Sequence, residues 1–244
     1  MQQNEDYRDI AQRVARVRET IAEAALSAGR DPKEILLCAA TKTNPTDRIR
    51  AAVAAGVDLC GENRVQELLQ KAPQGAYEGV PVHLIGHLQK NKAKQVVGLT
   101  DVIESVDSTE LLDLLDRLAE KAGIRQDILL EVRLAEEENK TGFFPTEAKQ
   151  AALEMERWPS LRLRGLMAIP PIASEPGQNR PFFAKLRELF VDIKLKTYDN
   201  ELIDCLSMGM SGDFADAVAE GSTMVRLGTA LFGPRAPISS QRAE

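Results

Sequence analysis

Eight short apolar runs, separated by segments with helical periodicity, set the strongest limit on how this chain can fold. The runs comprise residues 35–41, 57–60, 82–86, 102–106, 127–132, 163–169, 204–209 and 223–228. Several runs are apolar on consecutive residues, which is typical of strands with helices on one face and a packed interior on the other. Because helical segments separate the runs, the pattern predicts repeated strand–helix units with parallel strands.

The number of these units favours a closed barrel. The sequence has 244 residues, a length at which eight strand–helix units commonly form one undivided domain. An amphipathic helix is predicted at residues 5–28, ahead of the first run, with Gly29 just beyond its end. We therefore predict an α/β fold, a single (β/α)₈ TIM barrel with an additional N-terminal helix, over residues 1–233, followed by a polar tail at 234–244. An open doubly wound sheet is the alternative, since periodicity does not report closure.

Composition narrows the classes of partner. The formal net charge is -6, which gives no overall attraction for a phosphate backbone, although Lys90, Lys92 and Lys94 form one local basic run. No segment approaches the roughly 18 apolar residues that span a bilayer, and the first ten residues lack the apolar core of a signal peptide. We expect a cytoplasmic protein that binds neither nucleic acid nor a membrane.

Polar residues at the C-terminal ends of the predicted strands are the candidate functional residues, because the active sites of such barrels lie at that face. They are Lys42 after the first strand, Glu62 and Asn63 after the second, His87 after the third, Pro170 after the sixth, Ser211 after the seventh, and Arg226, Gly228 and Thr229 at the eighth.

Lys42 is the most reactive group in this set. It directly follows the apolar run 35–41, and partial desolvation at the mouth of a barrel lowers the pKa of an amine and raises its nucleophilic fraction. The alternative is an ordinary solvated lysine that opens the loop after the strand. Lys42 by itself does not decide between the two.

The segments 207–213 and 226–229 predict a phosphate-binding site. Glycines let backbone N–H groups approach an anion, hydroxyls add donors, and a helix predicted to start near Ser211 would add the positive end of its dipole. Barrel phosphate sites favour the loops after strands seven and eight. Arg226 precedes Gly228 by two residues, so both point the same way along the strand. An interior ion pair with Glu62 or another strand-end acid is the alternative role for Arg226.

The two histidines, His83 and His87, do not predict a metal site, because no further ligands lie at suitable intervals. His87 at a strand end is expected to contact a ligand or a loop, and His83 is expected to be an interior, hydrogen-bonded residue. Asp107 is predicted to cap a helix, with Glu110 three residues later.

In combination these segments resemble the pyridoxal phosphate homeostasis family, the single-domain relatives of the alanine racemase barrel. The resemblance extends from about residue 39 to residue 233. The matching segments are 39-AATKT-43, 61-GENRVQE-67, 83-HLIGHLQKNK-92, 104-ESVDS-108, 139-NKTG-142, 165-GLMAIPP-171, 207-SMGMSGD-213 and 222-STMVRLGTALFG-233.

The resemblance implies the cofactor pyridoxal 5′-phosphate (PLP) and a role for each candidate residue. Lys42 would carry PLP as a Schiff base, and Arg226 would face the pyridine nitrogen, where a permanent positive charge opposes protonation. The remaining implied contacts are Ser211, Gly228 and Thr229 with the phosphate, Ser207 as a weaker phosphate ligand, and Asn63 near the ring. His87 is added to the expected cofactor-binding residues on the ground of its strand-end position and not of the resemblance.

The resemblance also implies storage, buffering or delivery of PLP, with an effect on amino-acid and keto-acid balance and with apo-PLP enzymes as recipients. A racemase of this barrel type takes a tyrosine from a second domain, whereas Tyr7, Tyr77 and Tyr198 all lie outside the predicted strand ends. We therefore expect a binding protein without fast turnover. A monomer is expected because the undivided domain shows no long apolar surface segment. The alternatives are a slow PLP-dependent amino-acid racemase or lyase, and a Schiff-base aldolase that uses Lys42 without cofactor.

Overall fold

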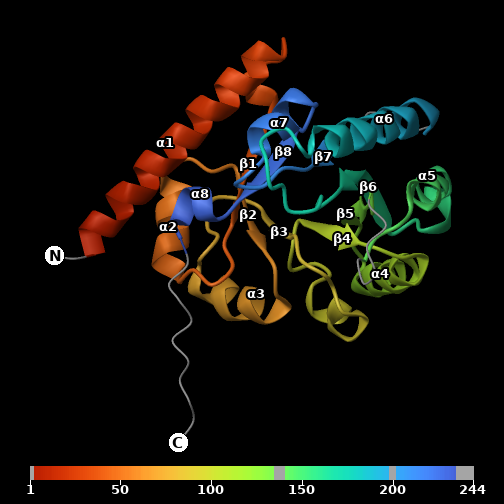
Figure 1. Ribbon diagram of the computed structural model, residues 1–244. Coiled ribbons are helices and arrows are strands. Elements are labelled where there is room, and N and C mark those ends of the chain that lie inside the picture. The colour runs from red at the N-terminus through yellow and green to blue at the C-terminus, as the bar shows by residue number, and fades with distance from the viewer. Residues whose placement is uncertain (1–2, 135–140, 198–201, 235–244) are drawn as a thin grey trace, which may run out of the picture.

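The computed structural model describes residues 3–134, 141–197 and 202–234, and within them eight parallel strands close into a barrel (Figure 1). The strands are β1 (Leu36–Ala40), β2 (Leu59–Glu62), β3 (Val82–Leu84), β4 (Val102–Val106), β5 (Gln126–Glu131), β6 (Leu161–Met167), β7 (Cys205–Ser207) and β8 (Met224–Leu227). They pair in sequence order, and β8 pairs with β1 to close the ring. The predicted barrel is confirmed, and the open sheet is excluded.

Helices surround the barrel and cover the outer face of its strands (Figure 1). The α-helices are α1 (Gln3–Ser27), α2 (Thr46–Ala54), α3 (Val65–Lys71), α4 (Thr109–Ala122), α5 (Pro145–Leu153), α6 (Arg180–Lys196), α7 (Phe214–Ala219) and α8 (Thr229–Phe232). Short 3₁₀ helices are η1 (Pro32–Glu34), η2 (Ala72–Gln74), η3 (Lys90–Gln95) and η4 (Met155–Arg157). In the unit between β3 and β4, η3 takes the place of an α-helix.

The additional helix α1 lies across the seam of the barrel. Its buried residues, Ile10, Val14, Val17, Ile21 and Ala25, have the predicted helical spacing, and the helix packs against α2, α7 and α8. A polar contact also holds α1 against the barrel, since the Arg18 guanidinium donates to Asp58 Oδ2 at 2.7 Å, just ahead of β2. Helix α1 is therefore part of the same packed body as the barrel.

The interior of the barrel has an apolar part and a polar part. Small and flexible apolar side chains fill it around Cys38, Ala40, Leu129, Met167 and Met224. Three polar side chains are also buried in the strands that line this interior. They are Glu104 on β4, Ser207 on β7 and Arg226 on β8, each at most 4% exposed. Buried groups of this kind need mutual partners, and those partners define the site below.

The prediction that a helix starts near Ser211 is wrong. Helix α7 begins at Phe214, because the side chain of Asp213 instead accepts the backbone N–H of Met210 at 2.7 Å and closes a turn. The other carboxylate oxygen of Asp213 accepts the amide of Asn179 at 2.7 Å, at the start of α6. The dipole of α7 therefore starts farther along the chain than the sequence indicated.

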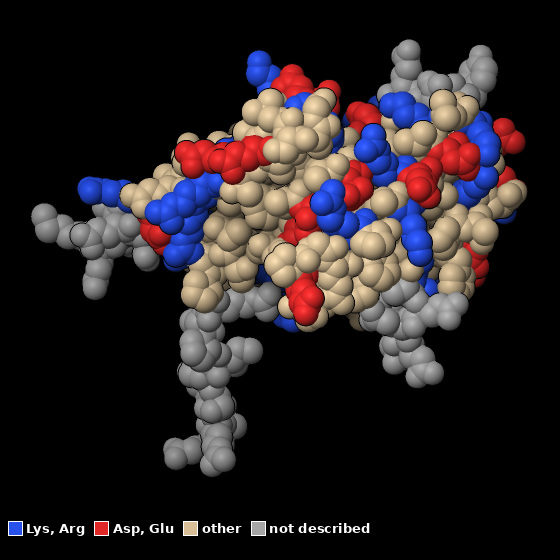
Figure 2. All heavy atoms as spheres, turned by 45° about the horizontal axis from the view of Figure 1, so that its top comes forward, with Lys and Arg blue, Asp and Glu red and all other residues tan. Residues whose placement is uncertain are grey.

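The surface carries both signs of charge. On the face shown in Figure 2, basic and acidic side chains are interspersed. Arg164, for example, bridges Asp127 at 2.9 Å and Asp204 at 2.6 Å. Among the helices of the described residues, none combines the length and the apolarity needed to cross a membrane.

Helix α1 is predicted to stabilise the whole barrel. Ile21 is 1% exposed, so Ile21→Ala should lower the free energy of unfolding by about 2–5 kcal/mol. Urea denaturation followed by circular dichroism measures this change. Leu26→Ala is the matched control, because Leu26 on the same helix is 67% exposed and should change stability by less than about 0.5 kcal/mol. Equal effects of the two substitutions would show that α1 does not contribute through its buried face.

Candidate functional site

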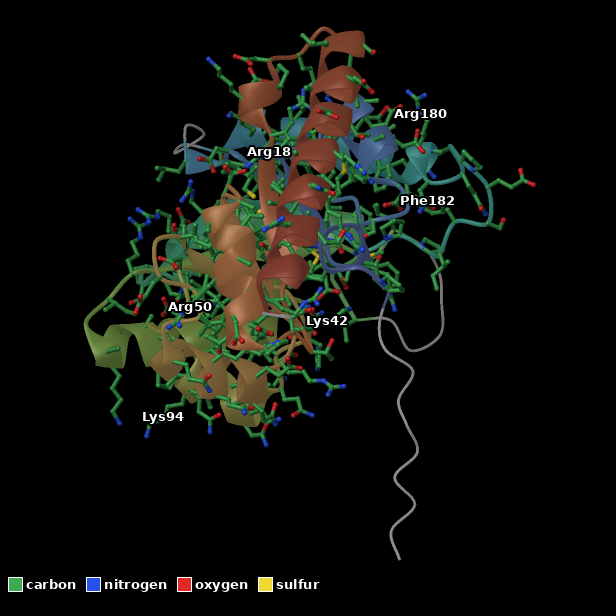
Figure 3. The ribbon with its side chains drawn as sticks, turned by 90° about the vertical axis from the view of Figure 1, so that its left-hand side faces the viewer. Arg18, Lys42, Arg50, Lys94, Arg180 and Phe182 are labelled. Carbon is green, nitrogen blue, oxygen red and sulfur yellow. The ribbon has the colours of Figure 1, made fainter. Side chains whose placement is uncertain are left out.

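The predicted site residues gather at the C-terminal end of the barrel because of strand alternation. Cys38 and Ala40 of β1 face the interior, and Lys42 continues the same alternation just past the end of the strand. The β1–β2 pairing aligns Ala40 with Gly61, which puts Asn63 opposite Lys42. In Figure 3, Lys42 lies at the opposite end of the barrel from Arg18. Arg18 donates to Asp58, just ahead of β2.

The seam between β1 and β8 brings Gly228 to the same place. The register aligns Ala39 with Leu227, so Gly228 lies beside Ala40. A Cβ added at Gly228 would lie 3.6 Å from the carbonyl oxygen of Ala40. Lys42, Asn63 and Gly228 therefore occupy one sector of the barrel mouth, formed by β8, β1 and β2.

A glycine between β2 and β3 lets their ends approach closely. A Cβ at Gly86 would lie only 2.2 Å from the carbonyl oxygen of Asn63, a distance that no side chain tolerates. The backbone of Asn63 is thereby packed against the end of β3. The side-chain Oδ1 of Asn63 is buried and has no hydrogen-bond partner among the described residues, which leaves it available to a polar ligand.

The turn after Lys42 is strained. Thr43 has φ 63°, a conformation that is unfavourable for a β-branched residue and costs on the order of 1–3 kcal/mol. The surrounding side chains hold it there. Glu67 Oε2 accepts the Thr43 N–H at 2.7 Å, and the Asn44 amide donates to the carbonyl of Lys42 at 3.1 Å. This turn sets the direction in which the chain leaves Lys42.

A buried ionic network supports this turn from the helix side of the barrel. Glu62 Oε1 accepts hydrogen bonds from the Thr41 hydroxyl at 2.7 Å and from Lys71 Nζ at 2.8 Å. Tyr77 OH donates to the same oxygen at 2.9 Å. Lys71 Nζ also donates to the carbonyl of Thr41 at 3.1 Å and to Glu67 Oε2 at 2.7 Å. Glu62, a candidate from its strand-end position, is thus a structural partner of α3 and not a residue of the mouth.

The pKa values within this network follow from burial and charge. Burial, together with the neighbouring Glu62 carboxylate, raises the pKa of Tyr77. Partial burial acts to raise the pKa of Glu67, but the hydrogen bonds from Lys71 and Thr43 and the charges of Lys71 and Arg64 hold it below its ordinary value of 4.5. Glu67 therefore stays ionised at neutral pH and continues to accept the hydrogen bond from the Thr43 N–H.

Arg226 lies deep in the barrel and pairs with a residue that the sequence interpretation missed. Its guanidinium donates to the Ala168 carbonyl at 2.9 Å and to the Ser207 hydroxyl, and it lies 3.9 Å from Glu104 Oε2. Of the acids considered for an interior ion pair with Arg226, Glu62 is not the partner, because it points away from the interior; the partner is Glu104, within β4. The sequence did contain a signal for Glu104, since it alternates with the interior-facing Val102 inside an apolar strand.

The two glycine-containing segments lie in contact. Ser211 Oγ accepts the backbone N–H of Gly228 at 3.3 Å and that of Ala230 at 3.2 Å. Thr229 lies between these two amides and is exposed. Ser207, by contrast, is fully buried, and its hydroxyl donates to Glu104 Oε2 at 2.6 Å. Ser211, Gly228 and Thr229 therefore lie together near the surface, while Ser207 lies deeper.

The opposite wall of the mouth contains three ionisable groups. His87 Nδ1 lies 3.2 Å from Asp107 Oδ2. Burial, with the nearby charge of Asp107, raises the pKa of Glu131, and Arg226 and His87 act in the opposite direction. A cavity of about 300 Å³ is lined by residues that include Asn63, His87, Glu131 and Pro170. Three of the predicted strand-end residues, Asn63, His87 and Pro170, thus line one cavity.

The sequence interpretation named no residue at the ends of strands four and five, and so it missed Asp107 and Glu131. The strand-end rule, extended to these two strands, would have found both. Asp107 was instead predicted to be a helix cap, which is wrong, since Ser108 is the N-cap residue of α4. Across the described residues, no group of three or more His, Cys, Asp or Glu side chains could hold a metal ion.

Comparisons with known proteins place this barrel in a family. Residues 11–236 match the model of the family described as alanine racemase, N-terminal domain. The pyridoxal phosphate homeostasis protein of Aquifex aeolicus is 41% identical over 224 residues, which cover 92% of this chain and 97% of that protein. The chain belongs to the pyridoxal phosphate homeostasis protein family, as its motifs predicted.

Solved structures agree with this assignment. A protein of unknown function from Bifidobacterium adolescentis matches with a TM-score of 0.87 and 39% identity, covering 93% of this chain and 96% of that one. PipY of Synechococcus elongatus, in a structure with PLP bound, matches with a TM-score of 0.78 and 34% identity, covering 92% of this chain and all of the PipY chain, 100%.

The support of the Thr43 turn by Glu67 predicts a dependence of stability on pH. A carboxylate whose pKa is lowered by folding stabilises the protein above its unfolded pKa, and that contribution is lost as the pH falls through its folded pKa. Glu67→Gln should therefore lower the free energy of unfolding at pH 7, and the difference from wild type should shrink below about pH 4. Urea denaturation at a series of pH values measures this. The control is Glu110→Gln at an exposed position of α4, and a pH-independent effect of Glu67→Gln would contradict the prediction.

Proposed function

We propose that this chain binds PLP as a Schiff base on Lys42 and serves in PLP homeostasis, by storing, buffering or delivering the cofactor. The observation that carries the proposal is the position of Lys42. It follows the interior-facing residues of β1 at the barrel mouth, beside Gly228 and opposite Asn63. The PLP-bound structure of the related PipY supports the same cofactor.

The residues at the mouth suit PLP in their chemistry. The backbone N–H groups of Gly228 and Ala230 converge on one point, now taken by Ser211 Oγ, and converging amides and hydroxyls bind phosphate oxygens. The buried, unpartnered Oδ1 of Asn63 offers an acceptor near Lys42. When bound, PLP supplies an aldehyde that condenses with an amine and a ring that withdraws electrons from the resulting C=N bond.

Lys42 provides the amine. Its backbone is held by the strained Thr43 turn, and strand alternation directs its Cα–Cβ bond toward the mouth. Fixing the backbone of a nucleophile lowers the entropy that is lost when it reacts. The primary amine of Lys42 adds to an aldehyde reversibly and with loss of water, which suits a protein that both holds and releases its cofactor.

Arg226 would face the ring nitrogen of PLP. A guanidinium does not deprotonate in proteins, and beside the pyridine nitrogen its positive charge opposes the addition of a proton. An unprotonated ring is a weaker electron sink, which disfavours carbanion chemistry. This supports a binding role without fast turnover.

The remaining proposed contacts divide between the two ends of the cofactor. Ser211, Gly228 and Thr229 would hold the phosphate, whereas Asn63 and His87, which share one cavity, would contact the ring side. Ser207 is the weaker phosphate ligand, since its buried hydroxyl already donates to Glu104. The proposal further includes a cytoplasmic, monomeric protein and apo-PLP enzymes as recipients of the cofactor.

The proposal predicts that Lys42 carries the cofactor. Protein reconstituted with PLP should show a visible absorption band that borohydride bleaches, and peptide mapping should find the reduced cofactor on Lys42. Lys42→Ala should lose both the band and the label, whereas Lys90→Ala, at an exposed lysine of η3, should keep them. An unchanged band in Lys42→Ala would refute the Schiff base at this position. Trapping of a carbonyl substrate in PLP-free protein would instead favour an aldolase.

The phosphate site generates a second prediction. Ser211→Ala and Thr229→Val each remove one hydroxyl near the Gly228 amide, so each should raise the dissociation constant of PLP about tenfold. Pyridoxal, which lacks the phosphate, should bind all variants with nearly equal affinity. Fluorescence titration measures both ligands, with Thr20→Val on α1 as the control. Equal losses for PLP and pyridoxal would show that these hydroxyls do not hold the phosphate.

Exchange of an amino-acid Cα proton in D₂O separates the binding role from the alternative of a slow racemase or lyase. A weak electron sink predicts exchange no faster than that caused by free PLP. Exchange well above that rate, lost in Lys42→Ala, would establish an enzyme.

A further inference from the structure

A chain of buried polar groups crosses the interior of the barrel and ends at Arg226. His83 Nδ1 lies 2.7 Å from Glu104 Oε1, and the Ser207 hydroxyl donates to Glu104 Oε2 at 2.6 Å. Ser207 Oγ in turn accepts from the Arg226 guanidinium. The four side chains come from β3, β4, β7 and β8, so they connect opposite sides of the barrel.

The donor and the acceptor of each hydrogen bond among these four side chains follow from their chemistry. A guanidinium has only donors and an ionised carboxylate has only acceptors. Ser207 Oγ must therefore accept from Arg226 and donate its single proton to Glu104. By the same reasoning His83 carries its proton on Nδ1. The hydroxyl proton of Ser207 is thus committed, which explains why Ser207 is the weaker candidate for a phosphate contact.

The charge on Glu104 is maintained although the residue is 0% exposed. Burial acts to raise its pKa, but the hydrogen bond and charge of His83, the charge of Arg226 and the hydrogen bond from Ser207 hold it below the ordinary value. A buried carboxylate is costly unless it is paired and hydrogen-bonded. The Arg226 guanidinium, 3.9 Å from Glu104 Oε2, supplies positive charge in this interior.

Arg226 is consequently held from two sides. The carbonyl of Ala168 accepts a hydrogen bond from one terminal nitrogen of the guanidinium at 2.9 Å. The other terminal nitrogen donates to Ser207 and lies 3.9 Å from Glu104 Oε2. Without Glu104, the guanidinium would lose its counter-charge and the acceptor that orients Ser207. Its charge would then be free to move within the barrel.

We propose that Glu104, with His83 and Ser207, positions Arg226 and thereby keeps the ring nitrogen of bound PLP unprotonated. This inference rests on the proposed function, because it concerns the same cofactor. Glu104, His83 and Ser207 are positioning residues in this scheme, since they act on the ring through Arg226. None of them has to touch the cofactor.

His83 is the member of this row of buried polar side chains that lies nearest the N-terminal end of the barrel. It lines a cavity of about 400 Å³ at the N-terminal face, together with Leu59, Arg164, Cys205 and Met224. Of the three supporting residues, His83 is therefore the one that lines a cavity at the face opposite Lys42.

The test measures the ring nitrogen directly, with PLP labelled by ¹⁵N in the ring and observed by NMR on the reconstituted protein. In wild type the signal should lie at the position of an unprotonated ring nitrogen. In Glu104→Gln it should move toward that of a protonated one, and the dissociation constant of PLP should rise about tenfold. Asp127→Asn is the matched control, because Asp127 is a buried carboxylate that pairs with Arg162 and Arg164 at the start of β5.

A second pair of variants guards against misfolding of Glu104→Gln. Ser207→Ala removes the bridging hydroxyl and should shift the ¹⁵N signal in the same direction. Ser207→Thr keeps the hydroxyl, so its ¹⁵N signal should lie at the wild-type position. The losses of PLP affinity in Glu104→Gln and Arg226→Met should be less than additive when combined, because both act on one interaction.

The outcomes separate the two levels of the proposal. Wild type that binds no PLP on Lys42 refutes the proposed function itself. Wild type that binds PLP, with the same ¹⁵N signal in Glu104→Gln and in Ser207→Ala, refutes the positioning role and leaves the proposed function standing. A shift in Asp127→Asn equal to that in Glu104→Gln would likewise refute it, because it would show a general effect of stability.

Discussion

Closure of the barrel between β8 and β1 is the contact on which the site depends. The pairing of Ala39 with Leu227 fixes the height of one strand against the other, and the two strand ends then meet at one level. A slip of one residue in this pairing would turn the side chains of one strand to its other face and so separate Lys42 from Gly228, because side chains alternate between the two faces of a strand. The helix α1 packs across this seam, against α2, α7 and α8, and so protects the register.

Two buried ionic networks lie on opposite sides of this strand wall. The outer one joins Glu62 and Lys71 between β2 and α3, and the inner one joins Glu104 and Arg226 inside the barrel. Each obeys the same rule, since a charge taken out of water must be met by opposite charge and hydrogen bonds. The outer network fixes the backbone around Lys42, and the inner one fixes the guanidinium. The backbone at Lys42 is thus fixed from outside the barrel wall, and the Arg226 guanidinium from inside it.

Much of this arrangement could be predicted from the sequence. Local periodicity was enough for the eight strands, and the strand-end rule was enough to select Lys42, Asn63 and Gly228. Closure could not be derived, because it depends on a pairing between the first and last strands. The partner of Arg226 was missed for a similar reason, since Glu104 is distant in sequence and meets it only across the interior. The start of α7 was misplaced because Asp213 closes a turn with Met210 that propensity does not reveal.

The strained turn at Thr43 has an evolutionary consequence. Its left-handed conformation is held by Glu67, and Glu67 is held in turn by Lys71 at the end of α3. A change in either segment alone leaves a strained backbone without its support or a buried charge without its partner. The loop after β1 and the helix after β2 should therefore be inherited as a unit among descendants of this chain. Selection on the backbone geometry at the end of β1 would then be recorded in a helix that lies on the outer face of the barrel.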